Sequence, residues 1–306
     1  MTFTKIALAG PSGFLGRKVL THLLTIPSLS KITILTQSVT PQNFPTSPLL
    51  TLIPISSYED KAALTSALKD HDLLISTVAG AAAGTVDRLL LAAATEADVR
   101  RFMPSEFTVD VLHPNALTFA GTSLVAAKIA NAKYIQELAQ QGKIEYTTLV
   151  TGGFLDWWFE MPNPVVNVMG REVKIFDGGD KRLTGVSTEF VARCIEAVIL
   201  MPEEETRDQR IRVAEVEYSG NDMLRAFEEV TGEEWTAVHQ TTDALLYEAE
   251  KASGRGDKRG QYLATILKLN FDGRGAASFE EGKSFAPKVE RGSLVDIVRR
   301  SLSAKV

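Results

Sequence analysis

The chain has little of several things that would point to other classes of protein. It contains one cysteine, Cys194, in 306 residues, which excludes an internal disulfide and favours a reducing compartment. No apolar run is long enough to span a bilayer, and no signal peptide precedes the first expected strand, so we expect a cytoplasmic protein with no membrane partner. Positive charge is not in excess, since the net charge is −5, and this argues against a nucleic-acid partner.

Motifs for metal binding and for nucleophilic catalysis are also missing. The four histidines show no ligand spacing with carboxylates or with the cysteine, so no metal site is expected. No Gly-x-Ser-x-Gly nucleophile motif occurs. What remains is an ordinary globular composition, 44% hydrophobic and 23% charged, on a chain long enough for two lobes.

A glycine-rich loop near the start of the chain is the most informative feature that is present. The apolar run Lys5–Ala9 is followed by three glycines in the spacing Gly-x-x-Gly-x-x-Gly and then by an amphipathic segment, an order that predicts strand, turn and helix. Gly10 permits the turn, Gly13 permits close approach of a pyrophosphate, and Gly16 permits the helix to pack on its strand. The helix N-terminus offers free N–H groups to a phosphate. We predict that this loop binds a dinucleotide through Gly10, Ser12, Gly13, Phe14, Leu15 and Gly16.

Strands and helices alternate through the first half of the chain, which predicts a parallel sheet with helices on both faces. The expected strands are Lys5–Ala9, Lys31–Leu35, Leu50–Ile55, Leu73–Val78, Arg101–Met103 and Ile144–Val150, and the expected helices are Phe14–Leu24, Asp60–Lys69, Thr85–Ala97 and Ser123–Gln141. The predicted fold is α/β, a Rossmann-type doubly wound parallel sheet with a smaller α+β substrate lobe. We expect residues 1–155 to form the NAD(P)-binding domain, with parts of 187–214 packing back on it, and residues 156–306 to form the substrate-binding lobe.

The end of the second expected strand bears on the type of cofactor. The sequence there, Leu35-Thr36-Gln37-Ser38, has no acidic residue to bind the ribose hydroxyls of NAD. It also has no arginine to bind the 2′-phosphate of NADP, although Thr36 and Gln37 can donate hydrogen bonds to one. The missing acid favours NADP (NADPH) over NAD, the missing arginine weakens that preference, and a loop without a ribose role is the alternative.

Small residues follow the fourth expected strand, in the run Ser76-Thr77-Val78-Ala79-Gly80. Open α/β sheets bind ligands at the carboxyl ends of their strands, and small side chains leave room for a cofactor there. We therefore predict that Thr77, Val78 and Ala79 line the cofactor site, with a turn selected for packing as the alternative.

The fifth expected strand runs into Arg101-Phe102-Met103-Pro104-Ser105-Glu106-Phe107, and the sixth into Tyr146-Thr147-Thr148-Leu149-Val150-Thr151-Gly152-Gly153-Phe154-Leu155-Asp156-Trp157. With the glycine loop, these runs resemble the isoflavone reductase-like, or NmrA-like, branch of the atypical short-chain dehydrogenases, especially its fungal members. The resemblance covers residues 1 to about 160. It implies an NAD(P)H-dependent reductase, with Ser105, Glu106, Phe107, Gly152, Gly153 and Phe154 around the cofactor.

Two departures from the family pattern stand out. Gln37 occupies a position where members commonly have arginine, which bears on NADP preference. Gly152 and Gly153 stand near a position where plant members have a polar residue, which bears on side-chain contacts near the nicotinamide.

The resemblance also implies a functional lysine on the helix after the fifth strand. Two lysines are candidates, and at about 100° per residue Lys128 lies within the apolar stripe of that helix whereas Lys133 lies off it. A lysine in an apolar stripe needs a charge partner, a ligand or a lowered pKa, unless it reaches solvent from the helix edge. We predict that Lys128 orients the nicotinamide ribose or acts as a general acid or base.

Aromatic residues follow the sixth strand, and Trp157 and Trp158 are predicted to contact a small hydrophobic, aromatic or polyketide-like substrate. Packing between the two lobes explains the same tryptophans equally well. Two other functions stay open: a non-catalytic, NAD(P)-binding regulator of the NmrA type, and a redox-neutral enzyme on the same scaffold. We expect a monomer or a homodimer.

Overall fold

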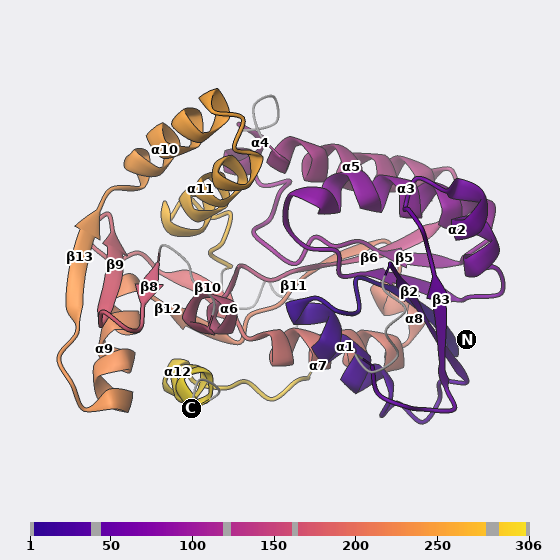
Figure 1. Cartoon of the computed structure of the whole chain (residues 1–306), viewed down its shortest axis with the longest axis horizontal. Helices are drawn as coiled ribbons and strands as arrows, with labels where there is room; N and C mark the ends of the chain where they lie inside the picture. Colours follow the sequence, from indigo (N-terminus) through magenta and orange to yellow (C-terminus); the bar gives the residue numbers. More distant parts are fainter. Residues whose placement is uncertain (1–2, 38–43, 119–123, 161–164, 280–287, 304–306) are drawn as a thin grey trace. The chain divides into compact units, whose positions relative to one another are not determined.

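The computed structural model of the chain describes residues 3–37, 44–118, 124–160, 165–279 and 288–303. The chain divides into two compact units (Figure 1). The first comprises Met1–Glu106, Ala126–Leu149 and Val191–Ile211, and the second comprises Phe107–Val125, Val150–Phe190 and Arg212–Val306. The second unit contains about as many residues as the first, because residues 107–125 and 150–155 belong to it.

A seven-stranded sheet of order β11-β6-β5-β4-β1-β2-β3 forms the centre of the first unit. Its strands are β1 (Lys5–Ala9), β2 (Lys31–Thr36), β3 (Leu50–Pro54), β4 (Leu73–Ser76), β5 (Arg101–Met103), β6 (Glu145–Val150) and β11 (Gln209–Arg212). Every pairing from β3 to β6 is parallel. The strand order reverses between β1 and β4, which is the doubly wound arrangement and confirms the predicted fold class.

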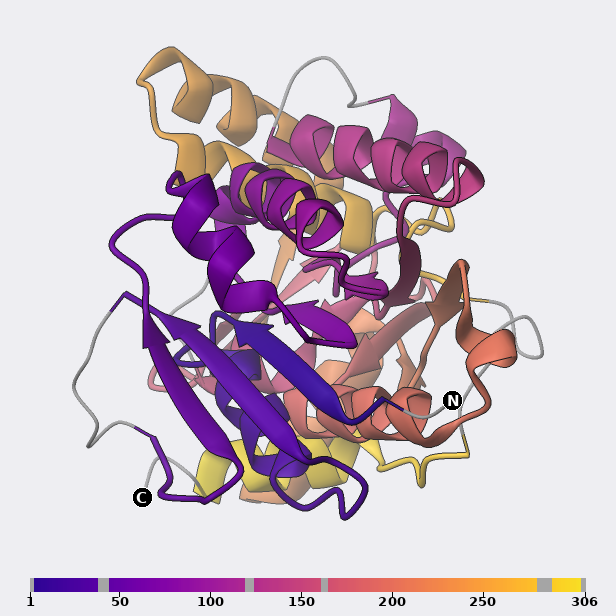
Figure 2. The same cartoon turned by 90° about the vertical axis from the view of Figure 1, so that its right-hand side faces the viewer.

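Helices cover both faces of this sheet (Figures 1 and 2). One face carries α1 (Phe14–Leu23) and α7 (Thr188–Leu200), the other carries α2 (Lys61–Leu68), α3 (Ala83–Glu96) and α5 (Leu124–Gln140), and α8 (Glu203–Thr206) is a single turn. Helix α1 illustrates why these helices pack on the sheet. Its buried residues Leu15, Val19 and Leu23 recur every four positions and form one apolar face. The predicted strands and helices of this half are all present, with ends that differ by at most two residues.

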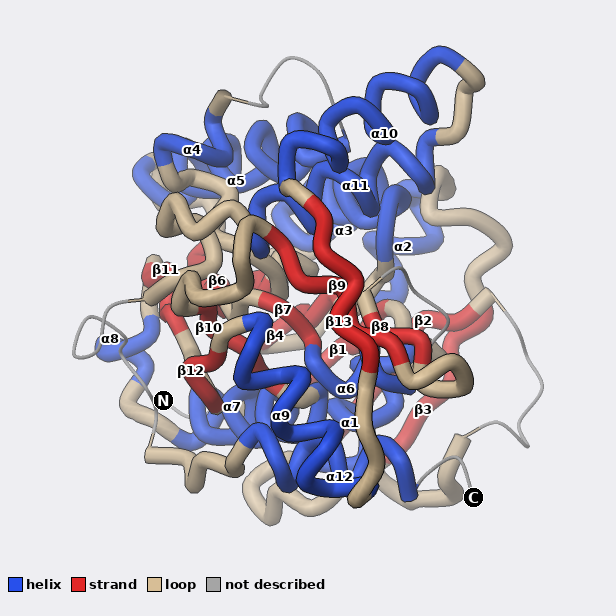
Figure 3. The backbone as a smooth tube through the Cα atoms, turned by 90° about the vertical axis from the view of Figure 1, so that its left-hand side faces the viewer, coloured by secondary structure: helices blue, strands red, loops and turns tan. Residues whose placement is uncertain are grey.

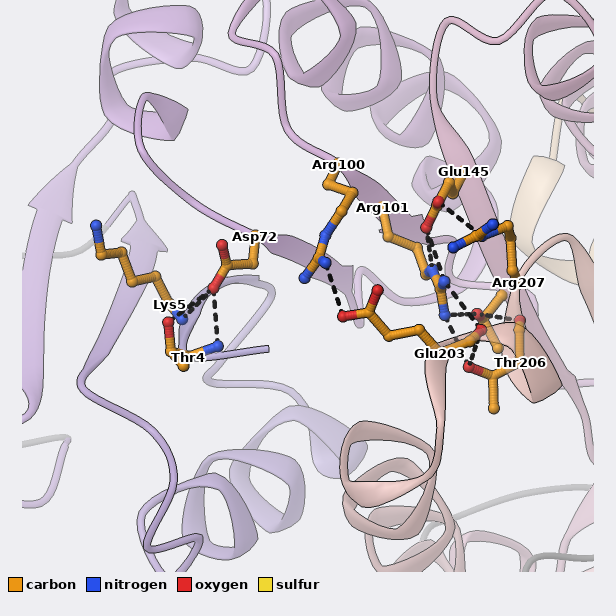
Figure 4. A network of polar contacts seen from close by, with 10 residues as sticks. Thr4, Lys5, Asp72, Arg100, Arg101, Glu145, Glu203, Thr206 and Arg207 are labelled. Atoms are coloured by element: carbon orange, nitrogen blue, oxygen red, sulfur yellow. Dashed lines mark hydrogen bonds and ion pairs between the residues drawn. The ribbon is translucent and has the colours of Figure 1, made fainter. Parts of the chain in front are cut away.

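A buried arginine holds together the amino-terminal edge of the sheet (Figure 4). The guanidinium of Arg101 is 1% exposed and donates to the Glu145 carboxylate at 2.7 and 2.9 Å and to the Thr206 hydroxyl at 2.7 Å. On the same edge, the Asp72 carboxylate accepts from the backbone N–H groups of Thr4 and Lys5, both at 2.8 Å. These contacts fix the strand ends opposite to the edge where ligands bind in such sheets.

The second unit contains two three-stranded sheets (Figure 3). One has the order β12-β10-β7, made of β7 (Gly153–Phe154), β10 (Leu183–Val186) and β12 (Val216–Tyr218), and the other has the order β13-β9-β8, made of β8 (Val166–Asn167), β9 (Glu172–Phe176) and β13 (Thr236–Gln240). Its helices are α4 (Pro114–Leu117), α6 (Leu155–Glu160), α9 (Gly220–Thr231), α10 (Thr242–Gly254), α11 (Lys258–Phe271) and α12 (Leu294–Ser303). A core of its own includes Trp158, Phe227 and Phe271, so this unit has its own source of hydrophobic stability.

No helix in the described ranges is both long and apolar enough to cross a bilayer.

Candidate cofactor site and lysine centre

The glycine loop joins β1 to α1 and has the backbone geometry predicted for it. Gly10 has φ = +76°, which glycine adopts without a Cβ penalty, and a Cβ there would lie 2.8 Å from the backbone of Thr77. A Cβ on Gly16 would overlap the carbonyl oxygen of Gly10, so the helix can approach its strand only with glycine at this position. The backbone roles predicted for Gly10 and Gly16 are therefore confirmed, whereas pyrophosphate binding at Gly13 stays a prediction.

The N-terminus of α1 suits an anionic group. Its N-cap residue, Gly13, has no side chain to bond the first free N–H groups, and the first turn contains no acidic residue. Ser12 is exposed, Phe14 is half-buried and Leu15 is buried. Arg17 donates from Nε to the carbonyl of Ser12 at 2.9 Å and so brings a positive charge to the loop. Sequence reasoning missed Arg17, although a basic residue directly after the third glycine was a visible signal.

Thr77 connects the carboxyl end of β4 to the glycine loop. Ser76, the last residue of β4, is level with Ala9 at the end of β1. The Thr77 hydroxyl donates to the carbonyls of Ala9 at 2.8 Å and of Gly10 at 3.0 Å. Val78 is half-buried and Ala79 is exposed at the same edge. Thr77 therefore stabilises the loop backbone, and contact of these three residues with a cofactor stays a prediction.

The end of β2 lies at the same sheet edge. Thr36 is the last residue of the strand and is buried, and Gln37 follows it with an exposed side chain. Ser38 lies outside the described residues. The exposed amide of Gln37 is a neutral hydrogen-bonding group, so it provides neither the charge that repels nor the charge that binds a 2′-phosphate.

Lys128 is buried on α5, with 6% of its surface exposed, whereas Lys133 on the same helix is exposed. The Lys128 ammonium donates to the backbone carbonyls of Ser105 at 2.5 Å and of Glu106 at 3.1 Å. An ammonium has three donor protons, so these two acceptors leave one for a further partner. The position predicted for Lys128 within the apolar stripe is confirmed, and its chemical role stays a prediction.

The segment after β5 supplies the acceptors for Lys128 and is itself held in place. The Ser105 hydroxyl donates to the carbonyl of Val78 at 2.7 Å. The Glu106 carboxylate is buried and accepts from Arg210 at 2.9 Å. Because the Glu106 charge is paired in this way, its carboxylate serves to fix the loop, while its carbonyl faces the lysine.

Asp87 on α3 completes this group, which we call the lysine centre and define as Asp87, Ser105, Glu106 and Lys128. Its carboxylate is fully buried and accepts from the Ser76 hydroxyl at 2.5 Å and from the Ser105 N–H at 2.7 Å. Burial raises the pKa of Asp87 from 3.8 to about 6, although the Ser76 hydrogen bond and the Lys128 charge oppose that rise. All four residues line a small pocket whose apolar walls include Leu91, Phe102 and Ile135.

Hydrogen bonds and short stretches of backbone together join the lysine centre to the glycine loop. Lys128 donates to Ser105, the Ser105 hydroxyl donates to Val78, and the neighbouring Thr77 donates to Gly10. All of these residues belong to the first unit. The cation and the predicted dinucleotide loop are therefore fixed relative to each other at the carboxyl edge of the sheet, where the strand order reverses.

Four of the predicted cofactor residues belong to the second unit, so their cofactor contacts stay predictions. Phe107 is buried with φ = +23°, an unusual backbone conformation for a residue with a Cβ. Gly152 has φ = +71°, and a Cβ there would overlap the carbonyl of Thr184. A Cβ on Gly153 would overlap the ring of Trp158, and Phe154 is half-buried. Packing within this unit is thus sufficient to explain both glycines.

The two predicted substrate residues differ in exposure. Trp158 is 4% exposed and its ring centroid lies 5.1 Å from that of Phe271 in the core of the second unit. Trp157 is half-buried and packs against the same core. Beside them, Asp156 accepts from the N–H of Thr188 at 2.8 Å, and burial raises its pKa to about 6. Substrate contact is a prediction for both tryptophans, and the larger exposed surface belongs to Trp157.

Within the described residues, no group of three or more histidine, cysteine, aspartate or glutamate side chains is arranged to hold a metal ion.

The chain matches one family model and is similar to proteins named as oxidoreductases and reductases. Residues 2–248 match the NmrA-like family. The oxidoreductase aprR of Aspergillus flavus is 29% identical over 234 residues, which span 76% of this chain and 75% of that protein. The isoflavone reductase homolog IRL of Zea mays is 23% identical over 263 residues, 81% of each chain. The solved structure of AtPrR2 with NADP⁺ and (+)-pinoresinol is similar with a TM-score of 0.74 and 18% identity, covering 98% of this chain and 99% of that one.

Proposed function

The chain is an oxidoreductase that belongs to the NmrA-like family, and from this membership we propose that it reduces a small hydrophobic, aromatic or polyketide-like metabolite with NADPH in preference to NADH. The likeness to AtPrR2, solved with NADP⁺ and (+)-pinoresinol, supports both the cofactor and the substrate class. The missing acidic residue after β2 is compatible with NADP.

The residues at the glycine loop fit a dinucleotide. Its turn leaves the N–H groups at the start of α1 without a side-chain cap, and Arg17 adds a positive charge. When bound, the reduced nicotinamide supplies the hydride, and the protein supplies orientation and charge. The pyrophosphate is assigned to Gly10, Ser12, Gly13 and the first turn of α1, and the ribose end to Thr36 and Gln37.

One observation carries the reductase proposal: the connection through hydrogen bonds and backbone from the Lys128 ammonium to the glycine loop. Lys128 is held as a donor by two carbonyls and retains one proton for the nicotinamide ribose or for a substrate oxygen. A positioned acid of this kind contributes about 10²–10⁴-fold to a rate.

Replacement of Lys128 tests this proposal. We expect Lys128→Ala to lower kcat by about 10²-fold or more, while the protein still folds and binds NADPH. Turnover is followed as loss of NADPH fluorescence, with (+)-pinoresinol and a panel of phenolic enones as probe substrates. Circular dichroism and an NADPH titration report on folding and binding.

Lys133→Ala is the matched control, because Lys133 is exposed on the same helix. We expect it to keep wild-type turnover. Equal turnover in the wild type and in Lys128→Ala would contradict the role of the lysine. If the wild-type protein binds NADPH tightly but no probe substrate leads to NADPH oxidation, the result would favour a non-catalytic, NAD(P)-binding regulator instead.

A further inference from the structure

Asp87 cross-links two neighbouring strands at the edge where the cofactor is proposed to bind. One carboxylate oxygen, Oδ1, accepts from Ser76 at the end of β4, and the other, Oδ2, accepts from the backbone of Ser105 just after β5. Its own helix, α3, therefore holds the ends of both strands through one side chain.

Ser105 is fixed from both sides of its backbone. Its N–H donates to Asp87, and its carbonyl accepts from Lys128. A shift of the Ser105 backbone would therefore move the acceptor that determines where the Lys128 ammonium lies. This makes the position of the lysine depend on a carboxylate that belongs to another helix.

We propose that Asp87 is a positioning residue of the lysine centre, which holds Ser105 so that the Ser105 carbonyl orients the Lys128 ammonium. This inference rests on the proposed reductase function for its kinetic readout. Asp87 accepts hydrogen bonds from Ser76 and Ser105, and it acts on Lys128 through Ser105 and through its charge.

The charge of Asp87 makes this role depend on pH. The ionisable groups that act on it are Lys128 from α5, Glu106 after β5, whose charge is paired with Arg210, and the half-buried Tyr58. Because the pKa of Asp87 is about 6, its carboxylate takes up a proton as the pH falls through that value. Neutral Asp87 accepts more weakly from Ser105 and no longer attracts the ammonium.

The first test compares pH profiles of kcat, measured by NADPH oxidation with the first active probe substrate. We expect wild-type kcat to fall below about pH 6, as the Asp87 carboxylate becomes protonated. Asp87→Asn has the same size without the charge, so we expect a lower kcat at pH 7.5, a KM for NADPH within about threefold of wild type, and no remaining decline near pH 6.

The variant Ser76→Ala provides an independent test of the role of Asp87. The Ser76 hydrogen bond lowers the pKa of Asp87, so its removal raises that pKa, and the acid decline of kcat should move to higher pH. Asp98→Asn, at an exposed position just after the end of α3, is the matched control and should keep the wild-type profile. An unchanged kcat and an unchanged profile in Asp87→Asn would overturn the inference.

A second readout needs no activity. In ¹H–¹⁵N spectra of the lysine ammonium groups, Lys128 should exchange its protons slowly in the wild type and in Asp98→Asn, and faster in Asp87→Asn. Equal exchange in Asp87→Asn and the wild type would overturn the positioning role. If no probe substrate leads the wild type to oxidise NADPH, the reductase proposal fails. The ammonium spectra then still decide whether Asp87 positions Lys128.

Discussion

Two carboxyl groups are buried with too few partners to keep an ordinary pKa, Asp87 in the first unit and Asp156 in the second. Burial raises the pKa of each from 3.8 to about 6, because a charged carboxylate loses hydration that its hydrogen bonds only partly replace. The folded protein therefore binds a proton at each site more tightly than the unfolded chain does. Both groups lower the free energy of unfolding as the pH rises from about 4 to 6.

Asp87→Asn should remove this penalty at one of the two sites. The pKa rise of about two units corresponds to a destabilisation of the folded state by at most roughly 3 kcal/mol. This destabilisation is absent below pH 3.8 and complete above the folded-state pKa. Relative to wild type, the free energy of unfolding of the variant should therefore rise between pH 4 and 6.5 and be no lower at pH 7.5. Urea denaturation across that range measures the difference. A variant that is less stable at pH 7.5 by more than about 1 kcal/mol would contradict this.

Sequence reasoning found Lys128 but overlooked Asp87, although the same pattern marks both. Lys128 lies among Val125, Ile129 and Ala132 on the buried stripe of α5, and Asp87 lies between Ala83 and Leu90 on the buried stripe of α3. A charged residue at a core position signals a partner in either case. The identity of that partner was not predictable, because the Ser105 backbone is distant in sequence and reaches both groups only in the folded sheet.

At the scale of elements, strand β1, the glycine loop and helix α1 depend on glycine for their packing. We expect Gly16→Ala to destabilise the protein by about 1–3 kcal/mol, because the added methyl overlaps the Gly10 carbonyl and pushes α1 away from its strand. The same movement should weaken NADPH binding. Gly254→Ala is the control, because nothing lies within 4 Å of a Cβ there. Urea denaturation and an NADPH titration of both variants check this, and a Gly16→Ala protein with wild-type stability and affinity would refute the packing argument.

An element could be predicted from the sequence where its conformation is determined by residues that are close together in the chain. The Gly10–Gly16 loop, its strand and its helix were predictable, since turn conformation and helix–strand contact arise within a few residues. Gly152 and Gly153 were interpreted as cofactor residues, but each also packs against a segment of the second unit, Thr184 or Trp158. Such close approaches depend on tertiary contacts, so the sequence alone offered no packing reason for these glycines.

At the scale of the whole molecule, the chain builds two units, each with its own hydrophobic core. The lysine centre and the glycine loop lie together in the first unit, although the loop begins at Gly10 and the lysine is residue 128. Parallel strands bring them together, because every crossover returns the chain so that the next strand ends at the same sheet edge. Residues 107–125 interrupt the first unit and belong to the second, a division that alternating strands and helices did not predict.

The central claim is that the carboxyl edge of the first unit holds a reduced nicotinamide cofactor beside Lys128. The most direct measurement is a titration of the wild-type protein with NADPH and, separately, with NADH, followed by the fluorescence of the reduced nicotinamide. We predict saturable binding of both, with NADPH bound more tightly, and weaker NADPH binding by Gly16→Ala. If neither NADPH nor NADH binds to the folded wild-type protein, this central claim is contradicted.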